Sequence, residues 1–199
     1  MNRTDIPNEK EISRSPSPLA KGAFEVFEAF IRAIIVVLVI LTFFFKICSV
    51  VGASMNNTLE QNERLLVQSI GYSPSEGDII VFHQTGTLNE PVVKRVIATG
   101  NRWVKIDYDN KLLYVSDDDS FDSTDIVDES AYAYFNTGSY TKSGSYTVFV
   151  PKGFLFVLGD NRNNSTDSRS FSIGLVDERR VLGKVILRFY PFDKFGTVN

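Results

Sequence analysis

Apolar residues are gathered into one long run near the N-terminus, followed by many short runs. Residues 33–45 contain a single polar residue, and the apolar bias continues on both sides of them. Thirteen helical residues span only ~20 Å, whereas the hydrocarbon core of a bilayer is ~30 Å thick. The flanks supply the missing length, with the charged ends of Arg32 and Lys46 reaching outward along their alkyl stems. We therefore expect a polar tail over residues 1–23 and a transmembrane helix over residues 24–47.

Lysine and arginine are distributed unevenly around this helix, which predicts its orientation. Five precede the centre of the apolar run: Arg3, Lys10, Arg14, Lys21 and Arg32. Beyond Lys46 the next basic residue is Arg64. Because positively charged flanks stay on the cytoplasmic side of a membrane, we expect a cytoplasmic N-terminus, with everything after the helix outside the cytoplasm.

Two other interpretations of the apolar run are weaker. The buried core helix of a soluble protein is usually amphipathic, whereas this run is apolar on every face. A cleaved signal peptide would end at small residues, and Val51-Gly52-Ala53 could serve, but a charged leader of about thirty residues before the apolar core is too long. An uncleaved membrane anchor is therefore favoured.

Short runs rich in valine, isoleucine and aromatic residues follow the helix, separated by glycine, proline, asparagine and aspartate, which is typical of strands joined by turns. We expect strands over residues 64–69, 78–83, 92–98, 103–107, 111–115, 145–150, 154–158 and 181–190. No amphipathic helix of ten or more residues is predicted after residue 55. Residues 48–199 are therefore expected to form one mainly β domain outside the cytoplasm, held at the membrane by a single helix.

The composition removes several kinds of chemistry. The 199 residues include one cysteine and one histidine, so the chain can form no internal disulfide and cannot supply the three or four nitrogen and sulfur ligands of a zinc site. Cys48 lies in an apolar stretch, which argues against Cys–His catalysis with His83, and His83 is expected to be structural or at the surface. A net charge of −3 gives no sign of the basic face that nucleic-acid binding needs. We expect no metal, no cofactor and no nucleic-acid partner.

Residues 117–129 carry seven acidic side chains in thirteen positions. A calcium-binding loop is the obvious alternative, but no glycine stands at the required turn and the spacing does not fit an EF-hand. We expect this segment to be a solvated surface loop.

Two adjacent basic residues interrupt one of the predicted strands. Since side chains alternate along a strand, Lys94 shares a face with Val92 and Val96, whereas Arg95 points to the other face. If only one face of the sheet is solvated, it can receive only one of the two charged side chains. The other is expected to point inward or into a cleft. Burial lowers the pKa of a lysine, which can make it a general base. The alternative, left open by this segment alone, is a half-exposed edge strand.

Ser54 and the polar segment 159–169 are further candidates. Ser54 lies nine residues beyond the apolar run, which places it within ~30 Å of the outer membrane surface. A serine between small residues is by itself usually part of a turn, and the second glycine of a nucleophile elbow is absent. Residues 159–169 follow a wholly apolar strand and can pair aspartate with arginine in a rigid loop, although the composition fits a merely solvated loop equally well.

Taken together, these segments resemble a known family. The matching motifs, in order, are Ser54-Met55 with Thr58-Leu59, Gly77 to Phe82, Val93 to Val96, and Gly159 to Arg169. Their order and spacing are similar to those of bacterial type I signal peptidases. Gly183-Lys184, Pro191-Phe192 and Phe195-Gly196 resemble the C-terminal signature of Gram-positive members. The resemblance covers the anchor and most of the domain, and leaves out the tail and a variable insertion at about residues 108–147.

The resemblance implies a mainly β catalytic domain with an antiparallel sheet of the signal-peptidase/LexA-like type, carrying a Ser–Lys dyad. Ser54 matches the nucleophile of the family, Lys94 its general base, and Ser165 the residue that orients the lysine. Two charged pairs match positions that we interpret as scaffold: Asp160 with Arg95, and Asp167 with Arg169.

Three positions depart from the family pattern. Asn57 stands where proline is usual, so the turn after Ser54 is expected to be looser, and Asn163 replaces a common aspartate. Gly52 stands where some members carry a serine of the oxyanion hole. That leaves backbone N–H groups, including the N–H of Ser54, as the expected donors to the oxyanion.

The function implied by the resemblance is that of a membrane-bound serine endopeptidase, which removes N-terminal signal peptides from secreted preproteins at the lipid bilayer. Shallow pockets lined by Val50, Leu59 and Val93 are expected to favour small side chains at the −1 and −3 positions of the substrate. A catalytically inactive relative that acts as an assembly factor is one alternative, but it should have lost the serine or the lysine. A self-cleaving Ser–Lys protease of the repressor type is another, but it should lack the anchor and carry a DNA-binding module.

Overall fold

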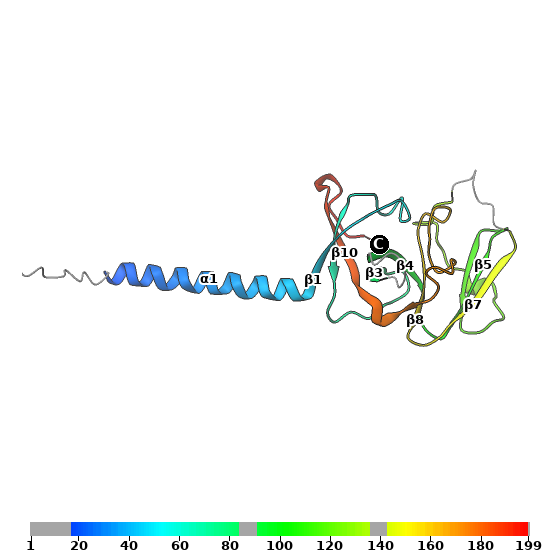
Figure 1. The fold of residues 1–199 in the computed structure, drawn as a ribbon, viewed down its shortest axis with the longest axis horizontal. Helices are drawn as coiled ribbons and strands as arrows, with labels where there is room; N and C mark the ends of the chain where they lie inside the picture. The colour runs from blue at the N-terminus through cyan, green and yellow to red at the C-terminus, as the bar shows by residue number, and fades with distance from the viewer. Residues whose placement is uncertain (1–16, 84–90, 136–142, 199) are drawn as a thin grey trace, which may run out of the picture. The chain divides into compact units, whose positions relative to one another are not determined.

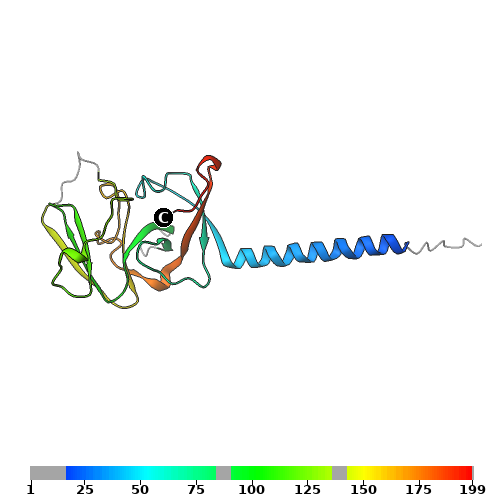
Figure 2. The same cartoon turned by 180° about the vertical axis from the view of Figure 1, so that it is seen from behind.

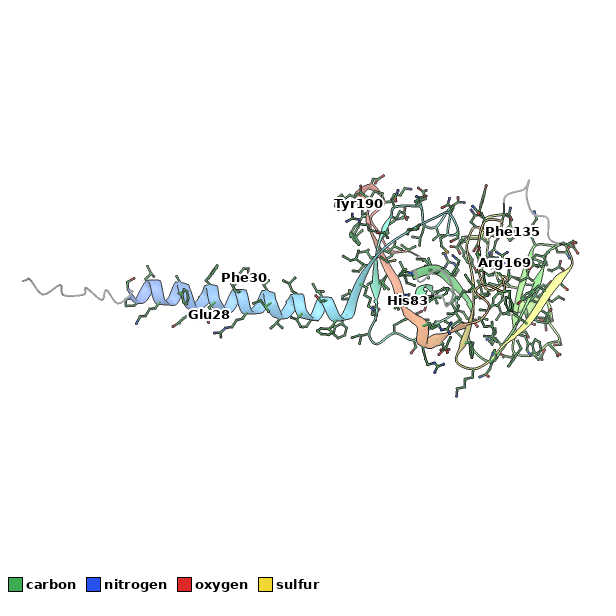
Figure 3. The ribbon with its side chains drawn as sticks, in the orientation of Figure 1. Glu28, Phe30, His83, Phe135, Arg169 and Tyr190 are labelled. Carbon is green, nitrogen blue, oxygen red and sulfur yellow. The ribbon has the colours of Figure 1, made fainter. Side chains whose placement is uncertain are left out.

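The computed structural model describes residues 17–83, 91–135 and 143–198, and the chain divides into two units after Leu41. The first unit contains most of a single helix, α1 (Pro18–Phe44). Its segment Lys21–Phe44 has a mean hydropathy of 2.5, and at 1.5 Å per residue it is ~36 Å long, enough to cross a bilayer. Apolar side chains are exposed all along the helix, and Figure 3 shows Glu28 and Phe30 projecting from opposite sides of it.

The ends of α1 differ from the expected span of residues 24–47. The helix begins earlier, at Pro18, because the fixed φ and the missing N–H of proline suit the first turn of a helix. It ends earlier as well, at Phe44, because the next residues form strand β1 (Phe45–Ser49). Phe45 and Ile47 would continue the apolar run, but residues 45–49 pair with β2 instead.

The main sheet of the second unit has seven strands in the order β1-β2-β10-β3-β4-β8-β9, and every neighbouring pair is antiparallel. Besides β1, its strands are β2 (Arg64–Gln68), β3 (Ile79–His83), β4 (Pro91–Ala98), β8 (Phe154–Leu158), β9 (Val176–Asp177) and β10 (Val181–Tyr190). Figure 1 shows β10 and β3 side by side in the middle of this sheet. The prediction of a mainly antiparallel β domain after one N-terminal helix is confirmed.

A smaller sheet packs against the main one. It has the antiparallel order β6-β5-β7, from β5 (Arg102–Asp107), β6 (Leu112–Ser116) and β7 (Ser145–Val150). Val104 and Leu113 of the small sheet belong to one hydrophobic cluster with Ile97 of β4 and Phe156 of β8. The two sheets are therefore joined by a shared core, and Figure 1 shows β5 and β7 at the end of the domain beyond β8.

The core of the main sheet covers both of its faces. Along β3, Ile79 and Val81 belong to one hydrophobic cluster, while Ile80 and Phe82 belong to another. All four side chains are buried, which is why this strand is a continuous apolar run rather than an alternating one. The C-terminal end of the chain returns to the first cluster through Val198, and Figure 2 shows it beside the main sheet.

The acidic segment 117–129 is exposed over most of its length. Asp122 caps a short 3₁₀ helix, η1 (Ser123–Asp125), and hydrogen bonds within the segment order its turns. Glu129 is different because it is only 9% exposed. For this residue the expectation of a solvated side chain is wrong, since Arg162 offers it a charged partner inside the protein.

Candidate active site

Ser54 lies in the turn that follows β1. The N–H of Asn56 donates to the carbonyl of Ala53 (3.2 Å), and the N–H of Leu59 donates to the carbonyl of Met55 (2.8 Å). The side chains of Met55 and Leu59 are buried in the core beneath the turn. The turn that carries Ser54 is thus held by its own hydrogen bonds and by two apolar anchors.

Lys94 comes from β4, an interior strand between β3 and β8, and its register partner on β3 is Ile80. Its side chain is only 3% exposed. The Nζ atom donates a hydrogen bond of 2.7 Å to the Oγ of Ser54 and one of 2.9 Å to the carbonyl of Val93. Because β4 is an interior strand, the alternative of a half-exposed edge strand is wrong. The structure brings the predicted nucleophile and the predicted base together.

The surroundings of Lys94 favour its neutral form. Burial lowers the pKa of Lys94 from 10.5 to about 8, although the negative charges of Asp167 and Asp160 act in the opposite direction. A pKa near 8 leaves roughly one lysine in ten neutral at pH 7, against fewer than one in 10³ for an unperturbed lysine. A general base must be neutral to accept a proton, so this shift makes the amine suitable for that role.

Arg95, the neighbour of Lys94, is buried as well, which the alternation argument did not predict for both residues. Its guanidinium forms a bidentate pair with Asp160, through Nε to Oδ1 (2.9 Å) and Nη2 to Oδ2 (2.8 Å). A third donor reaches the carbonyl of Gly77, and the ring of Tyr132 lies 4.0 Å from the guanidinium carbon. These contacts join β4 to the loop after β8.

That loop, residues 159–169, is called the site loop below. Asp167 forms a second pair with Arg169, at 2.7 Å, and accepts a hydrogen bond from the N–H of Gly159. Burial would raise the pKa of Asp167, but Arg169 and the Gly159 N–H hold it below its usual range. The site loop is therefore internally fixed and is not merely solvated.

Ser165 is brought close to Ser54 by a glycine. A Cβ atom on Gly159 would lie 2.2 Å from the Oγ of Ser165 and 2.5 Å from the carbonyl oxygen of Ser54, so only glycine allows this approach. The hydroxyl of Ser165 is buried and is near enough to Asp167 to favour its charged form. Among the described residues, no hydrogen bond joins this hydroxyl to Lys94.

A cavity of about 140 Å³ opens beside the Ser54–Lys94 pair. Its lining residues are Ser49, Val50, Val51, Ser54, Met55, Pro91, Val92, Val93 and Lys94. Val50 and Val93, two of the expected pocket residues, thus border the cavity. Leu59 does not, because it is fully buried in the cluster below.

Gly52 lies two residues before Ser54 with a φ of +85°. This left-handed backbone conformation disfavours residues with a Cβ atom, serine included. The backbone at Gly52 is thus adapted to glycine, so this position supplies no side-chain donor.

Sequence reasoning missed two residues that connect to the site. Asn161 donates from its backbone N–H to the carbonyl of Ser54 (3.0 Å) and from its side-chain Nδ2 to the carbonyl of Ala53 (3.0 Å). Glu129 forms a buried pair with Arg162. The position of Asn161 within the site loop motif was a usable signal, whereas nothing in the sequence distinguishes Glu129 from the exposed acids before it.

Cys48 and His83 lie apart from this chemistry. Cys48 is in β1, where burial raises the pKa of its thiol and so favours the protonated form. His83 is exposed at the end of β3, whose place is labelled in Figure 3.

The family model and the similar proteins both indicate the family that the sequence motifs resemble. The family model described as signal peptidase, peptidase S26, matches residues 23–190. Signal peptidase IB of Staphylococcus aureus is 36% identical over 153 residues, covering 72% of this chain and 77% of the relative. Probable signal peptidase I-1 of Synechocystis sp. is 33% identical over 156 residues, covering 73% of this chain and 71% of the relative.

A solved structure is also similar. The crystal structure of a signal peptidase I from Enterococcus faecalis V583 has 30% sequence identity to this chain and a TM-score of 0.43, covering 57% of this chain and 97% of that one. The family model alone spans most of the sequence, and both relatives exceed 30% identity over more than two thirds of it. The chain therefore belongs to the signal peptidase family, peptidase S26.

Proposed function

We propose that this signal peptidase removes N-terminal signal peptides from secreted preproteins with Ser54 as its nucleophile and Lys94 as its general base. The observation that carries the assignment is the 2.7 Å contact between Lys94 Nζ and Ser54 Oγ, made by a buried lysine. Serine is a weak nucleophile unless a neighbouring base takes its proton. Lys94, with its lowered pKa, can do this without a histidine.

The reaction then follows in two stages. Neutral Lys94 accepts the proton of the Ser54 hydroxyl while Oγ bonds to the carbonyl carbon of the scissile peptide. The resulting ammonium gives its proton to the leaving nitrogen, the C–N bond breaks, and the mature protein departs. A water molecule next attacks the acyl-enzyme, again losing a proton to Lys94, which releases the signal peptide as a carboxylic acid and restores the Ser54 hydroxyl.

Two further roles complete the proposed site. The developing oxyanion is assigned to backbone N–H groups, including the N–H of Ser54, because Gly52 carries no side-chain donor. Ser165 is assigned the orientation of Lys94, because it matches that position of the family motif and its hydroxyl is buried beside Gly159, close to the carbonyl of Ser54. Asp160 with Arg95, and Asp167 with Arg169, are assigned to the scaffold.

The cavity beside the dyad explains a preference for small side chains. At about 140 Å³ it is smaller than the ~300 Å³ of ordinary small-molecule sites. Val50 and Val93 line it with apolar surface, so a residue such as alanine fits and a large aromatic residue does not.

We assign the β domain to the outer side of the membrane and the N-terminus to the cytoplasm. Members of this family are anchored in the membrane, and α1 is long and apolar enough to span it. The excess of lysine and arginine before the helix supports the orientation.

Protease added outside intact protoplasts should digest the β domain. Full protection of the β domain from this protease would contradict the assignment.

The two alternative functions have little support. An inactive assembly factor has no need of a paired serine and lysine, yet Ser54 and Lys94 are in hydrogen-bond contact. A self-cleaving repressor-type protease has no need of a membrane anchor, and α1 is a candidate span.

The pH dependence of cleavage tests the function and the base together. With the full-length protein in detergent, kcat/KM for a secreted preprotein is expected to rise about tenfold per pH unit below pH 7 and to level off above about pH 8. The rate should rise with pH because only the neutral amine of Lys94 accepts the serine proton. With a pKa of about 8, the neutral fraction of this amine grows as the pH increases.

Initial rates across the pH range provide the measurement, with the product N-terminus identified by mass spectrometry. The control is the same preprotein with tryptophan in place of alanine at −1, which should stay uncut at every pH. Absence of cleavage would contradict the function, and a rate that falls as pH rises would contradict a neutral lysine base.

A further inference from the structure

A short segment between β6 and β7 lies against the site loop. This segment, residues 129–135, is called the strap. Glu129 begins the strap, and both of its carboxylate oxygens accept hydrogen bonds from the guanidinium of Arg162, with Nη1 to Oε2 at 2.5 Å and a second bond from Nη2 to Oε1. Glu129 is 9% exposed and Arg162 is 5% exposed. The strap is therefore fastened to the site loop by a buried, bidentate ion pair.

The backbone of the strap is fastened as well. The N–H of Tyr134 donates to the carbonyl of Asp160 (2.7 Å), and the N–H of Arg162 donates to the carbonyl of Tyr134 (3.0 Å). These bonds form a parallel bridge between Tyr134 and Asn161. Phe135 lines a small hollow together with Arg162 and Arg169, and Figure 3 shows Phe135 and Arg169 on the same side of the domain.

Asn161 connects this contact to the nucleophile. Its flanking peptide groups bond to the strap, while its own N–H and its Nδ2 bond to the carbonyls of Ser54 and Ala53. A displacement of the strap would therefore move Asn161, and with it the turn that carries Ser54. A misplacement of about 1 Å can cost a reaction roughly 10²-fold, so a small shift of this turn is expected to affect the reaction at Ser54.

The charge of Glu129 matters because of where Arg162 lies. Among the described residues, Glu129 is the acid with which Arg162 forms an ion pair. The Nε of Arg162 is held by the carbonyl of Gly159, and its own carbonyl accepts a hydrogen bond from Arg169. A buried arginine without its carboxylate is strongly unfavourable. Loss of the Glu129 charge would therefore drive Arg162 toward solvent and displace the site loop with it.

We propose that Glu129 is a positioning residue for cleavage, which acts through Arg162 and the strap to hold Asn161, and thereby Ser54, against Lys94. The inference rests on the catalytic roles proposed for Ser54 and Lys94. Glu129 does not line the cavity beside the dyad. Its replacement should therefore lower kcat and leave KM nearly unchanged, since substrate contacts are kept and the geometry of the reacting atoms is lost.

Glu129→Gln in the full-length protein is the test, because glutamine keeps the size and removes the charge. We expect kcat for preprotein cleavage to fall about tenfold, with KM within about twofold of wild type. The matched control is Asp119→Asn, which removes the charge of an exposed acid of the same segment outside the strap and should leave both constants within about twofold. An unchanged kcat, or a raised KM with unchanged kcat, would overturn the proposal.

Should Glu129→Gln give no cooperative melting transition, Glu129→Asp decides the matter, because it keeps the charge and shortens the reach by one methylene. A threefold or greater loss of kcat at constant KM supports the proposal, and full activity overturns it. Failure of the proposed function is distinguishable, because it would appear in the wild-type protein as absence of cleavage. Failure of this inference leaves the wild-type activity intact.

Discussion

Replacement of Ser54 by alanine in the full-length protein is expected to lower kcat for preprotein cleavage by about 10⁴-fold or more. Alanine removes the Oγ atom that lies 2.7 Å from Lys94 Nζ, and with it the only atom proposed to form the acyl-enzyme. Neighbouring turn contacts are made by backbone groups and by the buried side chains of Met55 and Leu59. The variant should therefore keep its fold and its substrate cavity.

Rates of product formation, with the cleaved N-terminus identified by mass spectrometry, measure the effect of Ser54→Ala. Ser120→Ala, in the exposed acidic segment, is the matched control and should cleave at the wild-type rate. Cleavage by Ser54→Ala at more than about 1% of the wild-type rate would require another nucleophile.

Lys94→Met should be nearly as damaging, with a loss of kcat of about 10³- to 10⁴-fold at every pH. Methionine fills much of the buried space of the lysine stem but carries no atom that can accept the Ser54 proton. The pH dependence should also disappear, because the group whose pKa is lowered to about 8 is gone. The same rate and pH measurements serve here, and Lys152→Met, at an exposed lysine, is the control.

Lys94→Arg separates positive charge from basicity. A guanidinium stays protonated at all accessible pH values, so this variant should be as inactive as Lys94→Met.

The double variant Ser54→Ala with Lys94→Met should be no worse than the poorer single variant, because the two residues act as one unit. A tenfold further loss in the double variant would show that each contributes separately.

The strands were predictable to the extent that their signals are local. Of the ten strands in the described residues, eight lie where short apolar runs end at turn residues, and β7, β8 and β10 have the expected bounds. The other two, β1 and β9, have no such signal. Residues 45–49 continue the apolar run of the helix, and become a strand because β2 offers hydrogen-bond partners. Strand β9 is two residues long, too short for any periodicity.

The residues of the candidate site were likewise predictable only where their signal is local in the sequence. Alternation along β4 predicted that a charge at Lys94 or Arg95 would face inward, and the structure buries both because Ser54 and Asp160 supply partners from other segments. Asn161 stands within the site loop motif, but its bonds to the carbonyls of Ala53, from the side chain, and of Ser54, from the backbone, depend on the fold. Glu129 is one acid among seven in its segment, and only the fold sets it apart.

The support of Ser54 by Asn161 has a consequence for the newly made chain. The contact joins residues more than a hundred positions apart, and the dyad itself joins residues 40 apart. Contacts between residues so far apart in the sequence form slowly during folding. A partly synthesised polypeptide that already contains Ser54 and Lys94 still lacks Asn161, so the proposed site can be completed only when the last fifth of the sequence is made. If Ser54 and Lys94 act as proposed, the order of synthesis along the chain delays activity until the site loop has been made.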